Sequence, residues 1–252
     1  MAVVGWWCWC SSFWRRWPFI FEGARAALGA AAWWRRVAGC GCLMWGRATR
    51  FWFARRRGKI VLVDAGVPGS GRVVLDALRR LGAPQVDLLV ATHAHADHIG
   101  GADEVIRAIK VLRVLDSTVP NATKNYEDFL SAIDETQAQY VGAAPGQTFD
   151  LGDGVVLDSA RSPPAFLHQR AVARGRNEPN ANSVVTRLDY GDFSMLLTGD
   201  AEAQTEERIL TNNGNVRASV LKVGHHGSRY ATSEELLRAG RFKGSDYFGE
   251  RG

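Results

Sequence analysis

Short apolar runs and stretches of helical periodicity alternate along the chain after residue 58. Four runs are rich in aliphatic and β-branched residues and are too short for helices, which predicts strands at 60–66, 86–92, 111–115 and 220–223. In three other segments apolar residues recur every three or four positions, which predicts helices at 73–81, 102–111 and 125–139.

Two further segments complete this pattern. Residues 149–157 are typical of a hairpin with its turn at 152–154, and the Pro- and Arg-rich stretch 159–180 is predicted to be a loop. Strands recur on both sides of helices. The pattern therefore favours an α/β fold in which two sheets pack face to face under helical layers.

The composition of residues 1–57 differs from that of the rest. This segment contains all nine Trp and all four Cys, with ten Arg and one acidic residue, a balance of +9. The rest of the chain holds 21 basic and 25 acidic residues, a balance of −4, so the net charge of +5 comes from the N-terminal segment. Charge therefore gives no argument for nucleic-acid binding by the larger part of the chain.

Three interpretations of residues 1–57 stay open. Trp and Arg favour the membrane interface, yet we find neither a signal peptide nor an apolar run of about 18 residues, so we expect a cytoplasmic or membrane-associated protein. A disulfide or a metal site is a second interpretation, built from Cys8, Cys10, Cys40 and Cys42. We prefer the third, that the segment is read out of frame or from a wrong start, which resequencing of the gene would test.

Potential metal ligands are most concentrated in the motif His-x-His-x-Asp-His, directly after the strand predicted at 86–92. Its four side chains are His93, His95, Asp97 and His98. Imidazole and carboxylate suit zinc, manganese or iron, and without a metal these groups would leave several buried polar atoms unpaired. Gly100 and Gly101 then predict a tight turn. The sequence thus predicts a metal site at the carboxyl end of a strand, where α/β sheets usually place their sites.

Together with three other motifs, this segment resembles the metallo-β-lactamase-fold hydrolases. The motifs are Asp64-Ala65-Gly66, Asn182-Ser183 ahead of Thr198-Gly199-Asp200, and Lys222-Val223-Gly224-His225-His226-Gly227-Ser228. They are most similar to the hydrolase domain of ComEC-type DNA-uptake proteins and their stand-alone relatives. The resemblance implies an αββα sandwich, two packed mixed β-sheets flanked by helices, with residues 58–239 as the hydrolase domain.

The two ends of the chain depart from this family pattern. No apolar strand is visible in the tail at 240–252, where the family has a further strand and a Gly-His-Pro motif. We therefore expect a sandwich that is incomplete at both ends, with an irregular or truncated tail.

The resemblance also implies a site with two divalent metal ions, zinc or manganese. Its ligands would be His93, His95, Asp97, His98, Asp200 and one of His225 and His226. The sequence does not decide between the last two, and we favour His225 because it comes first after the strand at 220–223. Asp200 is expected to bridge the two ions or to bind the second.

Other residues are expected to support these ligands. Asp64 is a catalytic candidate that accepts the N–H of a ligand histidine, with a plain turn residue as the alternative. Asp97, the other catalytic candidate, is also expected to handle a proton. Candidates for contact with the substrate or the ligands are Asn180, Asn182, Ser183 and Ser228. We expect His168 and Lys222 to face solvent.

The predicted function is hydrolysis by a metal-bridged hydroxide. Two neighbouring ions suit a phosphodiester, including DNA, which is the favoured substrate, and a membrane channel encoded nearby is a candidate partner. The first alternative is a small ester, lactone or thioester on the same site. The others are a membrane-tethered or partner-binding module based on residues 1–57, and a non-functional gene fragment.

Overall fold

The computed structural model describes residues 40–45, 48–53, 59–152, 154–159, 179–212, 214–242 and 247–248, with the backbone alone at 40–53 and 247–248. The interpretations of residues 1–39, including Cys8 and Cys10, and the expected exposure of His168 lie outside this part of the chain. Within it, no helix has the length and apolar character needed to span a membrane.

The first of two sheets has six strands in sequence order. Its β1–β2 and β2–β3 pairs are antiparallel, and the remaining pairs are parallel. The strands are β1 (Cys40–Trp45), β2 (Ala48–Phe53), β3 (Val61–Val63), β4 (Leu88–Ala91), β5 (Arg113–Asp116) and β6 (Gln139–Gly142).

The second sheet also has six strands, in the order β12-β11-β10-β9-β8-β7. Here β10, β11 and β12 run parallel, and the other pairs are antiparallel. The strands are β7 (Thr148–Asp150), β8 (Val155–Ser159), β9 (Thr186–Tyr190), β10 (Phe193–Leu197), β11 (Val220–Lys222) and β12 (Tyr247–Phe248). Both sheets are therefore mixed.

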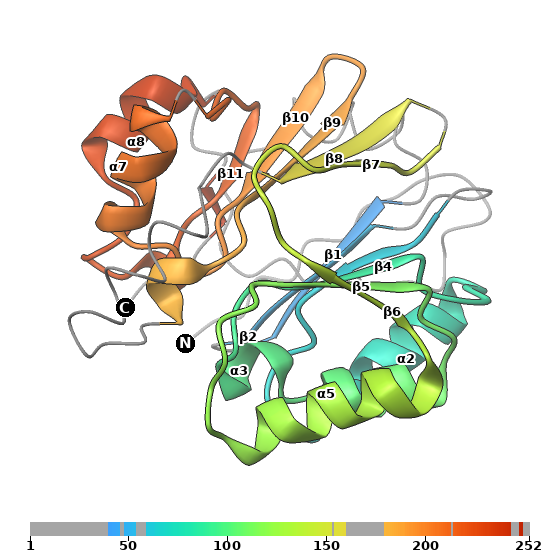
Figure 1. Ribbon diagram of the computed structural model, residues 1–252. Coiled ribbons are helices and arrows are strands. Elements are labelled where there is room, and N and C mark those ends of the chain that lie inside the picture. Colours follow the sequence, from blue (N-terminus) through green and yellow to red (C-terminus); the bar gives the residue numbers. More distant parts are fainter. Residues whose placement is uncertain are drawn as a thin grey trace, which may run out of the picture.

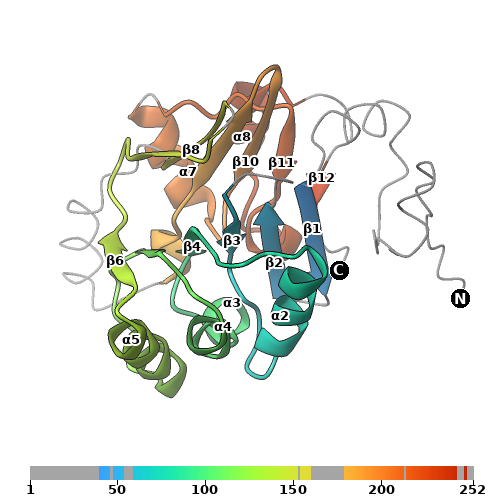
Figure 2. The same cartoon turned by 90° about the vertical axis from the view of Figure 1, so that its right-hand side faces the viewer.

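Helices cover the outer face of each sheet, as Figures 1 and 2 show. The first sheet is covered by α2 (Gly71–Arg80), α3 (Ala96–Ile99), α4 (Ala102–Ala108) and α5 (Lys124–Thr136). The second is covered by α7 (Ala203–Thr211) and α8 (Glu234–Gly240), and single 3-10 turns form η1 (Asn180–Asn182) and η2 (His225–Gly227). The predicted αββα sandwich is confirmed.

Alternation of side chains along the strands builds three cores. Leu62 of β3 packs in the core beneath α2, α4 and α5, whereas its neighbour Val63 packs between the two sheets. Leu196 of β10 belongs to a third core with Ile209 of α7 and Leu236 of α8. A strand covered on both faces is apolar throughout, which is why β3 and β4 were visible as apolar runs.

The structure corrects three expectations about the elements. β1 and β2 belong to the first sheet, although composition set residues 1–57 apart from the fold. β12 lies in the tail where no strand was expected, and two residues are too few to show a period. The second half of the metal motif forms the helical turn α3, whereas the first helix after this motif was expected at residue 102.

Asp116, the last residue of β5, is a buried carboxyl that the sequence analysis did not single out. Its Oδ2 accepts hydrogen bonds from the hydroxyls of Tyr126 (3.1 Å) and Tyr140 (2.8 Å) and from the Thr118 N–H (3.0 Å). Burial raises the pKa of Asp116 and outweighs these hydrogen bonds, which lower it. The carboxyl thus joins β5, β6 and α5 while its charged form is penalised.

Asp116→Asn is expected to change how stability depends on pH. A raised folded-state pKa gives stability that is complete below the unfolded value of 3.8 and is lost as the pH rises through the folded-state value. Between about pH 3 and pH 7, the free energy of unfolding of the uncharged variant should therefore rise relative to that of the wild type, by about 1.4 kcal/mol per unit of pKa shift. Urea unfolding at several pH values measures this gain. A gain that does not vary with pH, or one shared by the exposed control Asp192→Asn, would contradict the expectation.

Candidate metal centre

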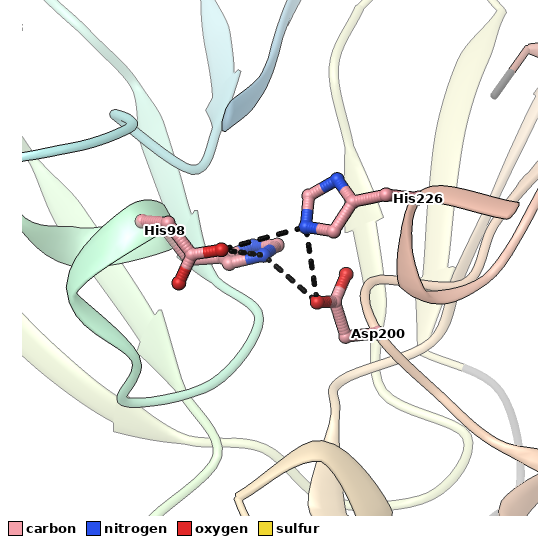
Figure 3. A group of neighbouring side chains, drawn as sticks. His98, Asp200 and His226 are labelled. Carbon is pink, nitrogen blue, oxygen red and sulfur yellow. Dashed lines mark ion pairs between the residues drawn. The ribbon is translucent and has the colours of Figure 1, made fainter. Parts of the chain in front are cut away.

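The site lies where strand ends of both sheets meet. Asp64 follows β3, the histidine motif follows β4, Asp200 follows β10, and η2 follows β11. β3 and β4 are parallel neighbours, as are β10 and β11. Their carboxyl ends therefore meet at one edge of each sheet, and the two edges face each other across the sandwich (Figure 3).

Four side chains gather there, and we call them the metal cluster: Asp97, His98, Asp200 and His226, whose ligand atoms all lie within 4.8 Å of one another. His226 Nε2 lies 3.3 Å from Asp200 Oδ2 and 3.4 Å from Asp97 Oδ2. His98 Nε2 lies 3.1 Å from Asp200 Oδ2 and 3.8 Å from Asp97 Oδ2.

Unpaired buried atoms show that the cluster fits a cation. The Nε2 atoms of His98 and His226 are buried and have no hydrogen-bond partner within the described part of the chain. Such atoms are costly unless something satisfies them. Two imidazole nitrogens and two carboxylates form a donor set that suits zinc, manganese or iron. The residues therefore fit a divalent metal ion.

The charges of the cluster are mutually stabilised. The interaction with His226 lowers the pKa of Asp97 to about 2, and the two aspartates raise the pKa of His226 to about 9. Burial lowers the pKa of His98, but Asp64 and Asp200 outweigh it and raise this pKa to about 10. Burial would raise the pKa of Asp200, but His226 and His98 hold it below its usual range. Both carboxylates are therefore ionised at neutral pH, as ligands must be, whereas His98 and His226 carry protons that a bound ion would displace.

His93 and His95 lie beside the metal cluster. His93 Nε2 is 3.1 Å from His95 Nδ1 and 4.0 Å from Asp200 Oδ2. Burial chiefly keeps the pKa of His93 well below its ordinary value, and the neighbouring His98 adds to this effect. A neutral imidazole is the form that binds metal. The structure thus brings His93 next to Asp200, the residue expected to bridge two ions or to bind the second, and brings His95 next to His93.

Of the two late histidines, His226 lies in the metal cluster. His225 Nδ1 instead lies 3.0 Å from Glu202 Oε1. This corrects our preference for His225, which assumed that the strand direction continues past β11. Both histidines have left-handed backbones, with φ of 42° and 54°, so the chain turns sharply and the second side chain reaches the site.

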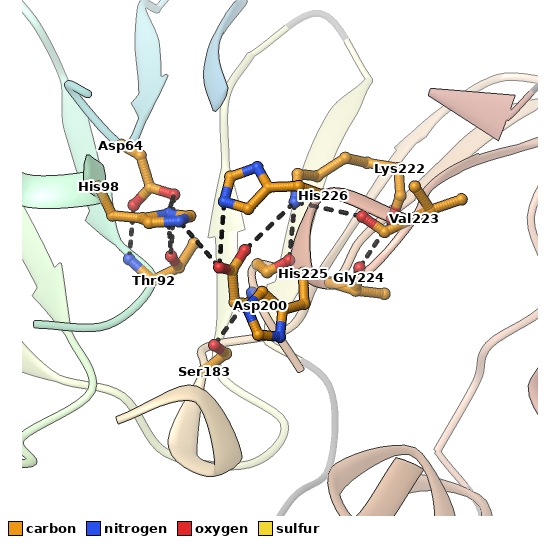
Figure 4. A network of polar contacts seen from close by, with 12 residues as sticks. Asp64, Thr92, His98, Ser183, Asp200, Lys222, Val223, Gly224, His225 and His226 are labelled. Carbon is orange, nitrogen blue, oxygen red and sulfur yellow. Dashed lines mark hydrogen bonds and ion pairs between the residues drawn. The ribbon is translucent and has the colours of Figure 1, made fainter. Parts of the chain in front are cut away.

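Asp64 supports His98 as expected from the sequence, although its catalytic role stays a prediction. Its Oδ2 lies 2.7 Å from His98 Nδ1. Thr92 donates its backbone N–H to Oδ1 (2.9 Å) and its hydroxyl to Oδ2 (2.8 Å). A carboxylate on Nδ1 fixes the ring so that Nε2 faces the cluster (Figure 4).

The remaining candidates lie on the turns around Asp200 and η2. Ser183 Oγ accepts the Asp200 N–H at 3.1 Å. Asn180 and Asn182 form the η1 turn before Ser183, and Asn180 Oδ1 is buried without a hydrogen-bond partner in the described chain. Ser228 Oγ accepts the Tyr230 N–H at 3.3 Å. The roles of these side chains stay predictions.

The structure overturns one other local expectation, because Lys222 is buried and not solvated. The turn expected at Gly100 and Gly101 is confirmed, since the two residues form the turn between α3 and α4. Their φ values of −61° and −103° are ordinary, so glycine is needed there for space and not for its conformational freedom. A Cβ on Gly100 would collide with the Ala96 carbonyl and with Pro68.

Sequence reasoning gave no role to Thr92 or Glu202, although each lies within two residues of a predicted ligand. Thr92 holds Asp64, and Glu202 holds His225. The signal that could have indicated a role was position alone, because Thr92 directly precedes His93 and Glu202 follows Asp200 by two residues.

The fold and the site together define an αββα protein with a cluster of metal-binding type between its sheets. A family model described as the metallo-beta-lactamase superfamily matches residues 45–249. The chain therefore belongs to the metallo-β-lactamase superfamily, whose members are generally hydrolases. The match includes part of β1 and all of β2.

Two curated relatives are similar over the same region. ComE operon protein 3 of Bacillus subtilis is 31% identical over 169 residues, which cover 66% of this chain and 20% of that protein. Recombination protein 2 of Haemophilus influenzae is 32% identical over 187 residues, which cover 72% of this chain and 20% of that protein. The match thus spans about a fifth of the length of these relatives.

The solved structure of an archaeal superfamily protein from Sulfolobus tokodaii is also similar. It is 19% identical, with a TM-score of 0.46, and the match covers 76% of this chain and 77% of that chain.

Proposed function

We propose that this protein is a metal-dependent phosphodiester hydrolase, with DNA among its substrates. The observation that carries the proposal is the metal cluster, in which the buried Nε2 atoms of His98 and His226 have no hydrogen-bond partner in the described chain. The similarity to a protein named for recombination favours DNA over a small ester. Membership of a superfamily of hydrolases supports the reaction type.

Two divalent ions, zinc or manganese, are proposed for the site. The metal cluster would hold one, and His93 and His95 would hold the other, with Asp200 between them. When bound, such ions lower the pKa of a water molecule and stabilise the charge that develops on oxygen during hydrolysis. Paired ions suit phosphodiesters, because they act on both the attacking and the leaving oxygen.

The chain's own side chains orient this chemistry. Asp64 holds His98 through Nδ1, and Ser183 holds the backbone of Asp200. The side chain of Asp97 is 40% exposed and that of His226 only 16%, so Asp97 is the residue of the metal cluster most open to solvent, and a part in proton exchange is proposed for it. Most other groups of the site are buried, which strengthens their electrostatic effect.

A substrate panel tests the proposal. The purified protein, stripped with a chelator and reloaded with zinc or manganese, is expected to hydrolyse bis-p-nitrophenyl phosphate and DNA only when metal is present. Asp97→Ala should lose this turnover, and Asp103→Ala, a change of the same type on α4, should keep it. Turnover of lactones or thioesters alone would overturn the phosphodiester assignment, and turnover unaffected by chelation would overturn metal dependence.

The membrane-channel partner remains part of the proposal. Sequencing the DNA on both sides of the gene tests it, because a reading frame for such a channel should adjoin.

A further inference from the structure

Lys222, the last residue of β11, is an ammonium group buried beside the metal cluster. The residue is 4% exposed. Its Nζ donates to the carbonyl oxygens of Gly199 (2.7 Å) and Val223 (3.3 Å) and lies 3.8 Å from Asp200 Oδ1 (Figure 4). A buried ammonium destabilises a fold unless it is paired and hydrogen-bonded, so these contacts compensate a large desolvation cost.

The acceptors of Lys222 belong to the two turns that carry metal-cluster residues. Gly199 directly precedes Asp200, and Val223 begins the turn that leads to His226. The Gly199 carbonyl also accepts the His225 N–H at 3.3 Å. Thr198 Oγ1 donates to the Lys222 carbonyl at 2.7 Å. The ammonium therefore lies at the junction that holds the Asp200 turn against the His226 turn.

The ammonium also distinguishes the two oxygens of Asp200. Oδ2 is the oxygen near His98 and His226, at 3.1 and 3.3 Å. Oδ1 faces Lys222 and has no hydrogen-bond partner in the described chain. Attraction between the ammonium and Oδ1 keeps the carboxylate rotated so that Oδ2 points into the metal cluster.

We propose that Lys222 is a positioning residue of the metal centre. It joins the turns of Asp200 and His226 and fixes which carboxylate oxygen is presented to the ion, although it is not a ligand. The proposal rests on the proposed function only in that the cluster binds a metal ion, whatever the substrate.

Electrostatics alone predicts the opposite effect of removing this charge. A cation near the site repels a divalent ion, so Lys222→Met would tighten metal binding if charge were all that mattered. A positioning role predicts weaker binding, because Asp200 and the His226 turn lose the group that orders them. The sign of the change in affinity therefore decides between the two.

The test measures Co²⁺ binding by the full chain, with every cysteine blocked by iodoacetamide so that thiolates do not contribute. The visible spectrum of Co²⁺ reports its coordination, and competition with a chromophoric chelator gives the dissociation constant. Lys222→Met is compared with Lys222→Gln, which keeps an N–H donor for Gly199 without the charge. Lys110→Met, at an exposed lysine after α4, is the matched control.

We expect Lys222→Met, once circular dichroism shows that it is folded, to bind Co²⁺ about tenfold more weakly or worse, as loss of an outer-shell partner typically does, with an altered spectrum. Lys222→Gln should be intermediate, and Lys110→Met should match the wild type. Binding by both Lys222 variants that is as tight as wild type, or tighter, overturns the proposal. Should the Met variant fail to fold, the Gln variant decides by the same criterion. Absence of Co²⁺ binding by the wild type would instead overturn the metal centre itself.

Discussion

Replacing His226 with alanine is expected to weaken metal binding by about 100-fold or more, while replacing His225 leaves it within a few-fold of the wild type. Removing an outer-shell partner alone costs roughly 10- to 100-fold, and His226 would itself be a ligand. Its Nε2 lies 3.3 Å from Asp200 Oδ2 and 3.4 Å from Asp97 Oδ2. His225 contacts Glu202 instead.

The pair forms a matched comparison, because the two residues are adjacent and share the same unusual backbone region. Titration calorimetry with Zn²⁺ on protein with blocked cysteines gives both affinities, and circular dichroism checks that each variant is folded. A larger loss in His225→Ala than in His226→Ala would restore the original preference and refute the assignment made from the structure.

Replacing Glu206 with alanine is expected to lower the free energy of unfolding by about 3 kcal/mol. Glu206 lies on α7 and is 1% exposed. Its Oε1 accepts the Thr232 N–H at 2.6 Å, and its Oε2 accepts the Ser233 N–H at 2.7 Å. Hydrogen bonds to a charged group contribute about 1.5–3 kcal/mol each, and the variant leaves both donors unpaired at the start of α8.

Glu207→Ala is the control for Glu206→Ala, since the next residue on α7 is exposed and should cost less than about 0.5 kcal/mol. Urea unfolding of both variants, without added metal, gives the difference. Thr232 Oγ1 also accepts the Gly224 N–H at 3.1 Å, so Glu206→Ala should weaken metal binding as well. Equal unfolding midpoints for the two variants would show that the carboxylate does not anchor α8.

Local patterns predicted most of the central elements because their physical cause is local. The runs at β3 and β4 are apolar since both faces of these strands are covered, and α2 and α5 show the period of a helix that packs on one side. The same reasoning failed at β1 and β2, where unusual composition hid two strands, and at β12, whose two residues pair only through β11.

The sequence predicted which residue types form the site, but it did not predict which of their side chains contact one another. A dense histidine and aspartate motif indicates metal chemistry in any fold, and its partner motifs indicated Asp64 and Asp200. The choice of His226 over His225 depends on two positive φ angles, which a His-His pair does not signal. The burial of Lys222 and of Glu206 depends on carbonyl and N–H groups from turns distant in sequence, so neither charge could be distinguished from a solvated one.

The metal cluster draws Asp97 and His98 from the first half of the sandwich and Asp200 and His226 from the second. An ion held by all four would link the two halves of the sandwich, so the halves could not separate without releasing the ion. Free metal at about 100 times its dissociation constant would add about 2.7 kcal/mol to the folded state. The concentration of free metal in the cell would then set the fraction of unfolded protein that is open to proteolysis, in addition to any effect on catalysis.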